Sequence, residues 1–394
     1  MNRQTVAWRN AVYVIFGLVG VGLSSWVSRI PEVRDYLQAS SSEMGLLLLG
    51  LSAGSIVGFI LSSRVVSTLG AKQSIFVCLC VSAGGLTLVG VSAAVLANFL
   101  LVFAGLAVFG AGGSICNVSI NVEAAAIERA LGRAIMPIFH AIYSIGAVVG
   151  VGLGALASAV HLSVAIHLAI VTALMVGSAA LAVRRFPPHE VLERAPSGPE
   201  TVHTPAVWHE HRTLMIGLLV LGMSFASGAA NDWIALAMVD GHDVSNTYGA
   251  LVYGAFIAAT TLGRIGGVRL LDRFGRVPVV RVSVVLALVG LALFIFVPVP
   301  EFAVAGAVLW GLGTALSFPI GMSAAADDPL RAPARISAVA AVGYGASLIG
   351  PPSIGLLGEH LGSLHALILV FAFVVMSGLV ASSARKPALT ADPM

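Results

Sequence analysis

The stretch Gly263-Arg-Ile-Gly-Gly-Val-Arg-Leu-Leu-Asp-Arg-Phe-Gly-Arg276 places four arginines and one aspartate between two long apolar segments, in a chain of which only 10% is charged. A fainter copy lies about 205 residues earlier, in Ser63-Arg-Val-Val-Ser-Thr-Leu-Gly-Ala-Lys72. In this pairing Arg64, Gly70 and Lys72 stand opposite Arg269, Gly275 and Val277. The pattern indicates a chain built from two related halves.

The composition excludes an ordinary soluble domain. The 394 residues are 58% hydrophobic with a mean hydropathy of +0.98, and long runs carry no charge. A bilayer core of ~30 Å is crossed by a helix of ~20 apolar residues, so the chain predicts many transmembrane helices. Because no small-residue cleavage site follows the first apolar run, we expect that run to be a span rather than a signal peptide.

Apolar runs bounded by charged residues, Gly or Pro predict twelve membrane-spanning helices in two sets of six. They cover residues 10–30, 43–63, 73–94, 97–124, 136–158, 163–183, 213–236, 246–268, 277–298, 301–325, 334–357 and 361–383. We expect an all-α integral membrane fold, with six-helix bundles over residues 1–183 and 213–394 and a cytoplasmic linker over 184–212. Because six is even, both halves share one topology, which predicts a pseudo-two-fold axis along the membrane normal and a cavity between the halves.

The positive charges predict the orientation. If both termini are cytoplasmic, every Lys and Arg except Arg29 and Arg34 falls on the cytoplasmic side, as the positive-inside rule requires. We expect a monomer in a lipid bilayer, and the net charge of +3 reflects this orientation rather than nucleic-acid binding. We expect no cofactor and no metal. The three cysteines lie in apolar segments. Three histidines of the central loop could form a metal site, but their spacing fits a linker better: His203, His209 and His211.

A Gly-rich loop bearing Arg and Asp, placed between spans two and three and repeated between spans eight and nine, resembles the signature of the major facilitator superfamily. The family pattern has Asp three residues before the second Gly; Asp272 and Gly275 fit it, whereas Ser67 precedes Gly70. Two further stretches resemble the bacterial YbjJ-type transporters of this superfamily, namely Trp26–Glu32 and Asn121–Arg133 with Met136–His140. The resemblance implies twelve helices, transport by alternating access and a place in a bacterial inner membrane.

The charged loops are the predicted gate. Asp272 can pair with arginines and with a helix N-terminus, which would fasten cytoplasmic helix ends in one state of the cycle. The alternative is that the basic residues only anchor the topology. The predicted latch comprises Arg64, Gly70, Lys72, Arg269, Asp272, Arg273, Gly275 and Arg276.

The fourth span carries the most polar stretch inside any predicted helix. Asn117 and Asn121 share a face by their i, i+4 spacing, and we interpret them as hydrogen-bonding partners of a solute. Glu123 is predicted to carry a proton, because ionisable residues within a membrane are costly and mark functional sites. The alternative places Glu123 at a wet helix end, paired with Arg129 or Arg133.

Two further pairs complete the predicted site. His140 and Tyr143 share a face at the start of the fifth span, where His140 either handles protons or is a structural hydrogen bonder. Arg29 is an exception to the positive-inside rule at the outer end of the first span. Its expected partner across the cavity mouth is Asp232, beside Trp233. The alternative is that Arg29 and Asp232 are solvated separately.

These patterns predict a secondary transporter of a small polar organic solute, with protons as the expected coupling ion, and not an enzyme. No ATPase motif of the Gly-Lys-Ser/Thr type occurs, so the energy for transport is expected from an ion gradient or from the solute's own gradient. The alternatives are a drug efflux transporter and a non-transporting membrane sensor or scaffold. Leu106 and Val151 replace the Arg and Pro that drug/proton antiporters of the resembled family carry, which argues against efflux.

Overall fold

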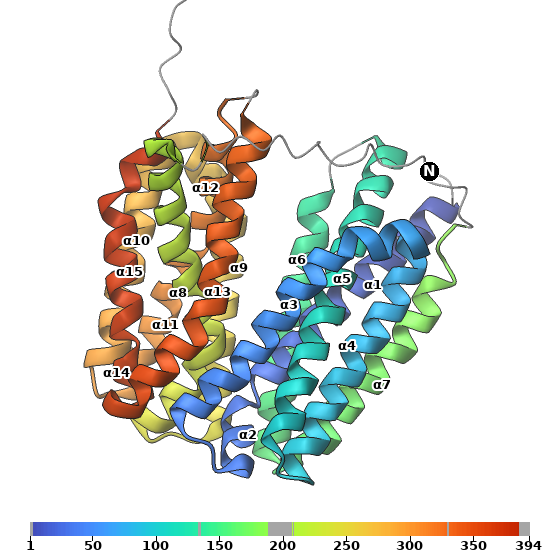
Figure 1. Cartoon of the computed structure of the whole chain (residues 1–394), viewed down its shortest axis with the longest axis horizontal. Helices are drawn as coiled ribbons and strands as arrows, with labels where there is room; N and C mark the ends of the chain where they lie inside the picture. Colours follow the sequence, from blue (N-terminus) through green and yellow to red (C-terminus); the bar gives the residue numbers. More distant parts are fainter. Residues whose placement is uncertain (1–2, 133–134, 188–206, 208, 329–330, 386–394) are drawn as a thin grey trace, which may run out of the picture. The chain divides into compact units, whose positions relative to one another are not determined.

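The computed structural model describes residues 3–132, 135–187, 207, 209–328 and 331–385 (Figure 1). Throughout these ranges the regular elements are helices. They are α1 (Arg3–Val27), α2 (Ile30–Leu37), α3 (Ser41–Leu69), α4 (Ala71–Ala94), α5 (Phe99–Leu131), α6 (Met136–Ala159), α7 (Val164–Val183), α8 (His211–His242), α9 (Asn246–Phe274), α10 (Arg276–Phe296), α11 (Pro300–Thr314), α12 (Ser317–Ala325), α13 (Ala332–Leu361), α14 (Ser363–Ala366), α15 (Ile368–Leu379) and the 3₁₀ helix η2 (Ala381–Ala384).

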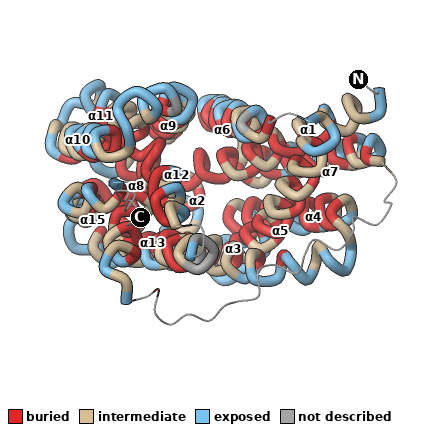
Figure 2. The backbone as a smooth tube through the Cα atoms, turned by 90° about the horizontal axis from the view of Figure 1, so that it is seen from above, coloured by how far each residue is buried: buried red, intermediate tan, exposed pale blue. Residues whose placement is uncertain are grey.

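The helices confirm the predicted all-α membrane fold. Eleven segments of the described chain are long and apolar enough to cross a membrane, and a shorter apolar segment, Ser363–Leu379, falls where the twelfth span was expected. Buried residues lie on the sides of helices that face other helices, and exposed residues lie on the outer sides (Figure 2). The outer sides carry large apolar side chains such as Ile60, Leu100 and Leu379, which are 71%, 74% and 81% exposed. Such surfaces are stable in lipid rather than in water.

Three of the departures from the predicted helix bounds change the order or continuity of the helices or extend a helix that carries predicted site residues. The short helix α2 follows α1 within the predicted first loop. Helix α5 continues to Leu131 instead of ending near residue 124; it closes at Gly132 (φ 63°), and Glu128 Oε1 accepts hydrogen bonds from the backbone N–H groups of Ile135 and Met136 at 2.6 and 2.7 Å. The tenth span is broken into α11 and α12, and the twelfth span is broken into α14 and α15.

Gly70 and Gly275 form single-residue turns with nearly the same backbone geometry. Gly70 joins α3 to α4 with φ 76° and ψ 157°, and Gly275 joins α9 to α10 with φ 77° and ψ 174°. This region of φ and ψ is essentially restricted to glycine because a Cβ atom would be strained there. The repeated glycine of the two charged loops thus has the same structural reason in both places.

The repeat extends to helix packing. A Cβ atom added to Gly112 would press on the backbone of Cys78 and Ser82, and one added to Gly313 would press on the backbone of Ser283 and Ala287. Small residues let helix backbones approach closely in a membrane. The glycines at 146, 150 and 154 meet α1 and Ser28 in the same way, so they also allow close helix packing.

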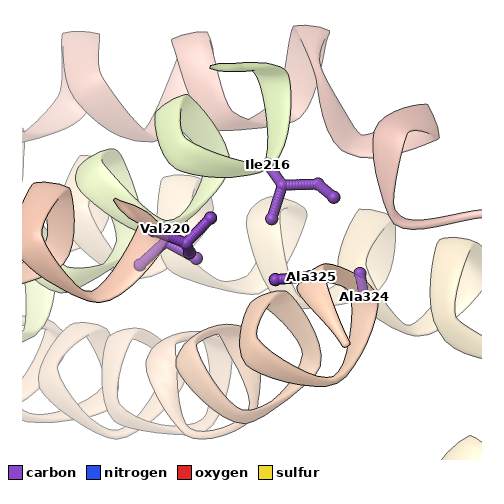
Figure 3. Packing of buried hydrophobic residues seen from close by; sticks show 5 residues of the cluster. Ile216, Val220, Ala324 and Ala325 are labelled. Atoms are coloured by element: carbon purple, nitrogen blue, oxygen red, sulfur yellow. The ribbon is translucent and has the colours of Figure 1, made fainter. Parts of the chain in front are cut away.

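The chain separates into two compact units. One comprises residues 1–189, 231–258 and 351–366, and the other comprises residues 190–230, 259–350 and 367–394. Within the second unit, Ile216 and Val220 of α8 pack with Ala324, Ala325 and Val339 (Figure 3). Most of the expected linker lies outside the described residues, as do Arg133 and His203, and the division into six-helix halves stays a prediction.

Candidate functional site

Two of the predicted polar residues lie in one pocket of the first unit. This Asn117 pocket measures about 210 Å³ and is enclosed by residues of α1 and of α3 to α7, including Asn117 and Tyr143. Ser55, Ser82 and Ser114 are its other polar wall residues, and Leu, Val, Phe and Met side chains supply most of the rest. A largely apolar pocket with a few convergent polar groups is the usual form of a small-molecule site.

Asn121 positions Asn117 rather than lining the pocket beside it. The Asn121 side-chain amide donates to the Asn117 backbone oxygen at 2.8 Å and to Asn117 Oδ1 at 3.2 Å. These bonds follow from the i, i+4 spacing on α5. Asn117 lines the pocket and Asn121 does not, so the pair presents one braced amide to a solute rather than two independent ones.

A second polar group adjoins Tyr143. Tyr253 of α9 is 1% exposed, and its hydroxyl donates to Asn231 Oδ1 on α8 at 3.3 Å. Ser24, Tyr143 and Asp232 also lie close enough to interact with the Tyr253 hydroxyl. Sequence reasoning missed Tyr253, although a tyrosine in the interior of an apolar helix is a usable signal because buried hydroxyls need partners. The structure thus brings Tyr143 and Asp232 together around a residue that was not predicted.

Glu123 is buried within a helix and is not at a wet helix end. It is 3% exposed, and its Oε2 atom accepts a hydrogen bond from the indole N–H of Trp8 at 2.9 Å. Among the described residues, Lys72 of the charged loop is the cation whose charge acts on Glu123, and Arg129 is exposed. The wet-end alternative is wrong because α5 continues for two further turns beyond Glu123.

Arg29 is buried but does not pair with Asp232. Its guanidinium is 3.5 Å from Glu32 Oε1, and its Nη2 atom donates to the Leu162 backbone oxygen at 2.7 Å. Burial lowers the pKa of Arg29, and the charge of Glu32 opposes this shift. Among the described residues no ion pair joins Arg29 to Asp232, because Asp232 lies nearly three helical turns before the end of α8 and is close to Tyr253.

The ion pair expected of Arg29 is made by Arg34 instead. Arg34 of α2 pairs with Asp240 near the end of α8, and Asp240 also accepts a hydrogen bond from the Ser363 hydroxyl at 3.0 Å. Nearby, the Asn246 amide donates to Asp35 at 3.3 Å, and the Ser42 backbone N–H donates to Glu359 at 3.2 Å. These polar contacts, named the Arg34 cluster below, join residues 34–42 to three segments more than 200 positions away.

Two other predicted residues have apolar surroundings. The exposed ring of His140 packs edge-on against Phe16 with ring centres 5.6 Å apart. Trp233 is fully buried, and its indole N–H has no hydrogen-bond partner among the residues that the structure describes. Neither residue lines the Asn117 pocket.

The sequence model of the major facilitator superfamily matches residues 11–268 and 228–391, which together cover most of the chain. The chain belongs to the major facilitator superfamily. Curated relatives span nearly the whole of it. An uncharacterized transporter of Sinorhizobium fredii is 31% identical over 365 residues, with 91% of this chain and 93% of the relative covered. An uncharacterized MFS-type transporter of Yersinia pestis is 28% identical over 384 residues, with coverages of 94% and 93%.

Solved structures show the same superfamily fold. A mutant of the nucleoside transporter NupG superposes with a TM-score of 0.79 at 17% identity, covering 97% of this chain and 99% of the other. A D-xylose-proton symporter superposes with a TM-score of 0.70 at 13% identity, covering 96% and 98%. At these identities the likeness establishes the fold. The YbjJ-type subgroup stays a prediction.

In this superfamily member the signature loop of the second unit engages a different residue from the one expected. Arg276 donates to Asp327 at 2.7 and 3.0 Å and to the Ser323 hydroxyl at 2.7 Å. Arg212 donates to the same carboxylate at 2.6 Å. Asp272, in contrast, is exposed and forms no ion pair within the described chain. The acidic partner was predicted in the loop, whereas it lies after α12.

The remaining loop residues lie at the surface. Arg269 and Arg273 are exposed, and the Arg273 guanidinium lies 5.3 Å from the ring centre of Phe274. Arg64 is also exposed, whereas Lys72 is half-buried near Glu123. A gating role for these residues stays a prediction.

A second charged group of this transporter joins the start of α8 to that of α13. Glu210 accepts hydrogen bonds from Arg335 at 2.6 Å, from Arg331 at 2.7 Å and from the Thr213 hydroxyl at 2.9 Å. The Arg335 bond is the main reason that the pKa of Glu210 falls to about 2, although partial desolvation opposes it. Arg335 also lies 3.5 Å from Asp328, which follows α12.

Proposed function

We propose that this superfamily member is a secondary transporter that moves a small polar organic solute, held during translocation by the Asn117 pocket. The observation that carries the proposal is the meeting of Asn117 and Tyr143 in one pocket, next to the Tyr253 hydroxyl. The pocket volume of about 210 Å³ suits a small solute. Its few polar groups would fix the orientation of the solute.

The Arg34 cluster supports alternating access. Alternating access requires contacts that form when one side closes and break when it opens. Arg34 and Asp240 are charged, only partly buried and far apart in sequence, so such a pair can separate into water at little cost. We propose that the cluster closes the outer side, and that Asp272 and the loop arginines act on the inner side in the opposite state.

Glu123 is the proposed proton carrier. It is the carboxylate of the fourth span, buried and held by one hydrogen bond from Trp8. Ionisable groups in such positions mark proton relays in transporters. Lys72 belongs to the charged loop and acts on Glu123, which links the proposed proton site to the proposed gate.

The charge distribution and the repeat carry the remaining proposals. The distribution of Lys and Arg, with Arg29 and Arg34 as the exceptions, favours cytoplasmic termini. We propose that the membrane is a bacterial inner membrane. The shared geometry of Gly70 and Gly275 supports two six-helix halves over residues 1–183 and 213–394. We propose that the transporter works as a monomer.

The solute class is supported by the solved neighbours. A nucleoside transporter and a D-xylose-proton symporter share the fold over nearly the whole chain. Nucleosides and xylose are hydroxylated molecules, which suit an amide and phenol hydroxyls as binding groups. A thermal-shift screen of nucleosides, sugars and organic acids on the purified protein is the first step, because a ligand of the folded state raises its apparent stability.

Proteoliposome uptake of a solute found in that screen tests the function. Asn117→Ala should weaken uptake about two- to tenfold, as expected for losing one neutral hydrogen bond. Glu123→Gln should remove the response to an imposed pH gradient. Gln73→Ala, an exposed substitution at the start of α4, is the matched control. Binding without uptake by the wild-type protein would contradict transport and would favour the sensor.

Efflux of amphipathic drugs is the second candidate. It is favoured by the apolar wall of the Asn117 pocket, which includes Val19, Leu23, Phe109 and Met175. Flexible Met and aromatic walls accept varied ligands. Stabilisation by lipophilic cations, together with no response to sugars or nucleosides, would favour this candidate over the first.

A further inference from the structure

A second pocket of the first unit is unlike the Asn117 pocket because it is polar. This Arg29 pocket measures about 440 Å³, within the usual size range of small-molecule sites. Its walls come from the start of α2, the turn between α6 and α7, and the segment between α8 and α9. The polar wall residues include Arg29, Glu32, Ser158, Asn246 and Thr247.

The pocket contains an ion pair whose hydrogen-bonding capacity is mostly unused. Arg29 and Glu32 side chains are only 3% and 12% exposed and lie 3.5 Å apart, which is longer than a charge-assisted hydrogen bond. Within the described part of the chain, Arg29 Nε and Nη1 and both Glu32 oxygens have no hydrogen-bond partner. Buried polar atoms without partners are costly, so this pair is a place where a ligand would gain binding energy.

The charges restrict the ligand class. An anion would satisfy Arg29 but would face the Glu32 carboxylate, and a cation would satisfy Glu32 but would face Arg29. A hydroxyl group both donates and accepts, so neighbouring hydroxyls can accept from Arg29 while they donate to Glu32. The opposite charges 3.5 Å apart therefore favour a neutral ligand with adjacent hydroxyls.

We propose that the Arg29 pocket is a second binding site, for a neutral polyhydroxylated solute. This inference deepens the proposed function, since the pocket would hold the transported solute apart from the Asn117 pocket. Arg29 supplies the donors and Glu32 the acceptors, while Ser158, Asn246 and Thr247 border the rest of the solute. Arg29 and Glu32 also oppose each other's charge, so charged analogues of the same solute are rejected.

Three probes that share one hydroxylated chain test the proposal: D-glucose, D-gluconate and D-glucosamine, which are neutral, anionic and cationic. Binding is measured by calorimetry on the full-length protein in detergent, in an Asn117→Ala background that weakens the other pocket. We expect glucose to bind more tightly than either charged probe. Glu32→Gln should shift the gluconate-to-glucose preference by about tenfold or more towards gluconate, because like-charge repulsion is removed. Arg29→Gln should shift it towards glucosamine.

Milder variants guard against misfolding, since breaking a buried ion pair is destabilising. Thr247→Val keeps the shape and removes one wall hydroxyl, and it should weaken glucose binding several-fold, by about the worth of one hydrogen bond. Thr68→Val, on the exposed end of α3, should leave binding unchanged. Binding of none of the three probes, tighter binding of gluconate than of glucose by the parent protein, or an unchanged order after Glu32→Gln would overturn the proposal.

The two hypotheses fail separately. Glucose uptake that depends on Asn117 but not on Glu32, with an unchanged binding order, would overturn the Arg29 site and leave the transport proposal intact. Charge-ordered binding that depends on Glu32, with no uptake of any bound probe, would overturn transport and leave the site.

Discussion

The indole N–H of Trp8 donates a 2.9 Å hydrogen bond to the buried carboxylate of Glu123, 115 residues later in the chain. Trp8→Phe should lower stability by about 1.5–3 kcal/mol, because hydrogen bonds to charged groups are worth that much and the carboxylate would lose its donor. The loss should be smaller in a Glu123→Gln background, since an amide is cheaper to leave unpaired. Thermal unfolding of the four proteins in detergent gives the coupling energy. If the effects of the two substitutions on stability are additive, the hydrogen bond between Trp8 and Glu123 contributes nothing to the stability of the folded protein.

The Arg34–Asp240 pair should be worth about 0.2–1 kcal/mol, the usual range of a partly exposed ion pair. Arg34→Ala and Asp240→Ala should therefore show a coupling of that size in a double-mutant cycle. Exposed charges are screened by salt, and the Debye length falls from about 14 Å at ~50 mM NaCl to about 4 Å at ~500 mM. The coupling energy should therefore decrease over this range. Asp243→Asn removes a nearby exposed charge and is the control. A coupling that does not depend on salt would contradict this view of the pair.

The Glu210 cluster predicts an acid-sensitive contribution to stability. The pKa of Glu210 falls from 4.5 to about 2 in the folded protein. A carboxylate whose pKa is lower in the folded than in the unfolded protein stabilises the folded state at any pH above the pKa of the unfolded protein. This contribution disappears as the pH falls through the pKa of the folded protein. Wild type should therefore unfold at a higher temperature than Glu210→Gln at pH 7, and the difference should vanish between about pH 4.5 and 2. A difference that stays constant over this range would exclude the ionised cluster as its source.

Gly275→Ala should destabilise the protein by about 1–3 kcal/mol, the cost of a strained backbone conformation. The site has open space around it, so the cost comes from φ 77° and not from a clash. Gly84→Ala is the matched control, because Gly84 has equal space but lies inside α4. There alanine is favoured by up to about 1 kcal/mol. Thermal unfolding measures both; equal effects would contradict the backbone argument.

The sequence was sufficient for the fold because membrane thickness sets the length of each apolar run. It also located Gly70 and Gly275, whose conformation only glycine adopts, and it placed Asn117 and Tyr143 in what proved to be one pocket. Side-chain partners could not be predicted in the same way. Hydropathy shows that a helix is in the membrane, but it does not show which faces meet.

Two site residues illustrate this limit. Glu123 was placed near a helix end because the apolar run stops at residue 124, whereas capping at Gly132 and by Glu128 extends the helix. Arg29 was assigned a partner by position in the repeat. The chain instead inserts α2, which carries Arg34 to Asp240 and keeps Arg29 with Glu32.

The adjacent prolines of α13 have a mechanical consequence. Pro351 and Pro352 lie inside the helix, and the boundary between the two compact units falls between Gly350 and Pro351. Neither proline has a backbone N–H, so two rungs of the helical ladder are missing at that point. The bending stiffness of α13 is therefore lowered at this point, and the part of the helix that follows is held close to the start of α3, where Gly355 meets Gly45.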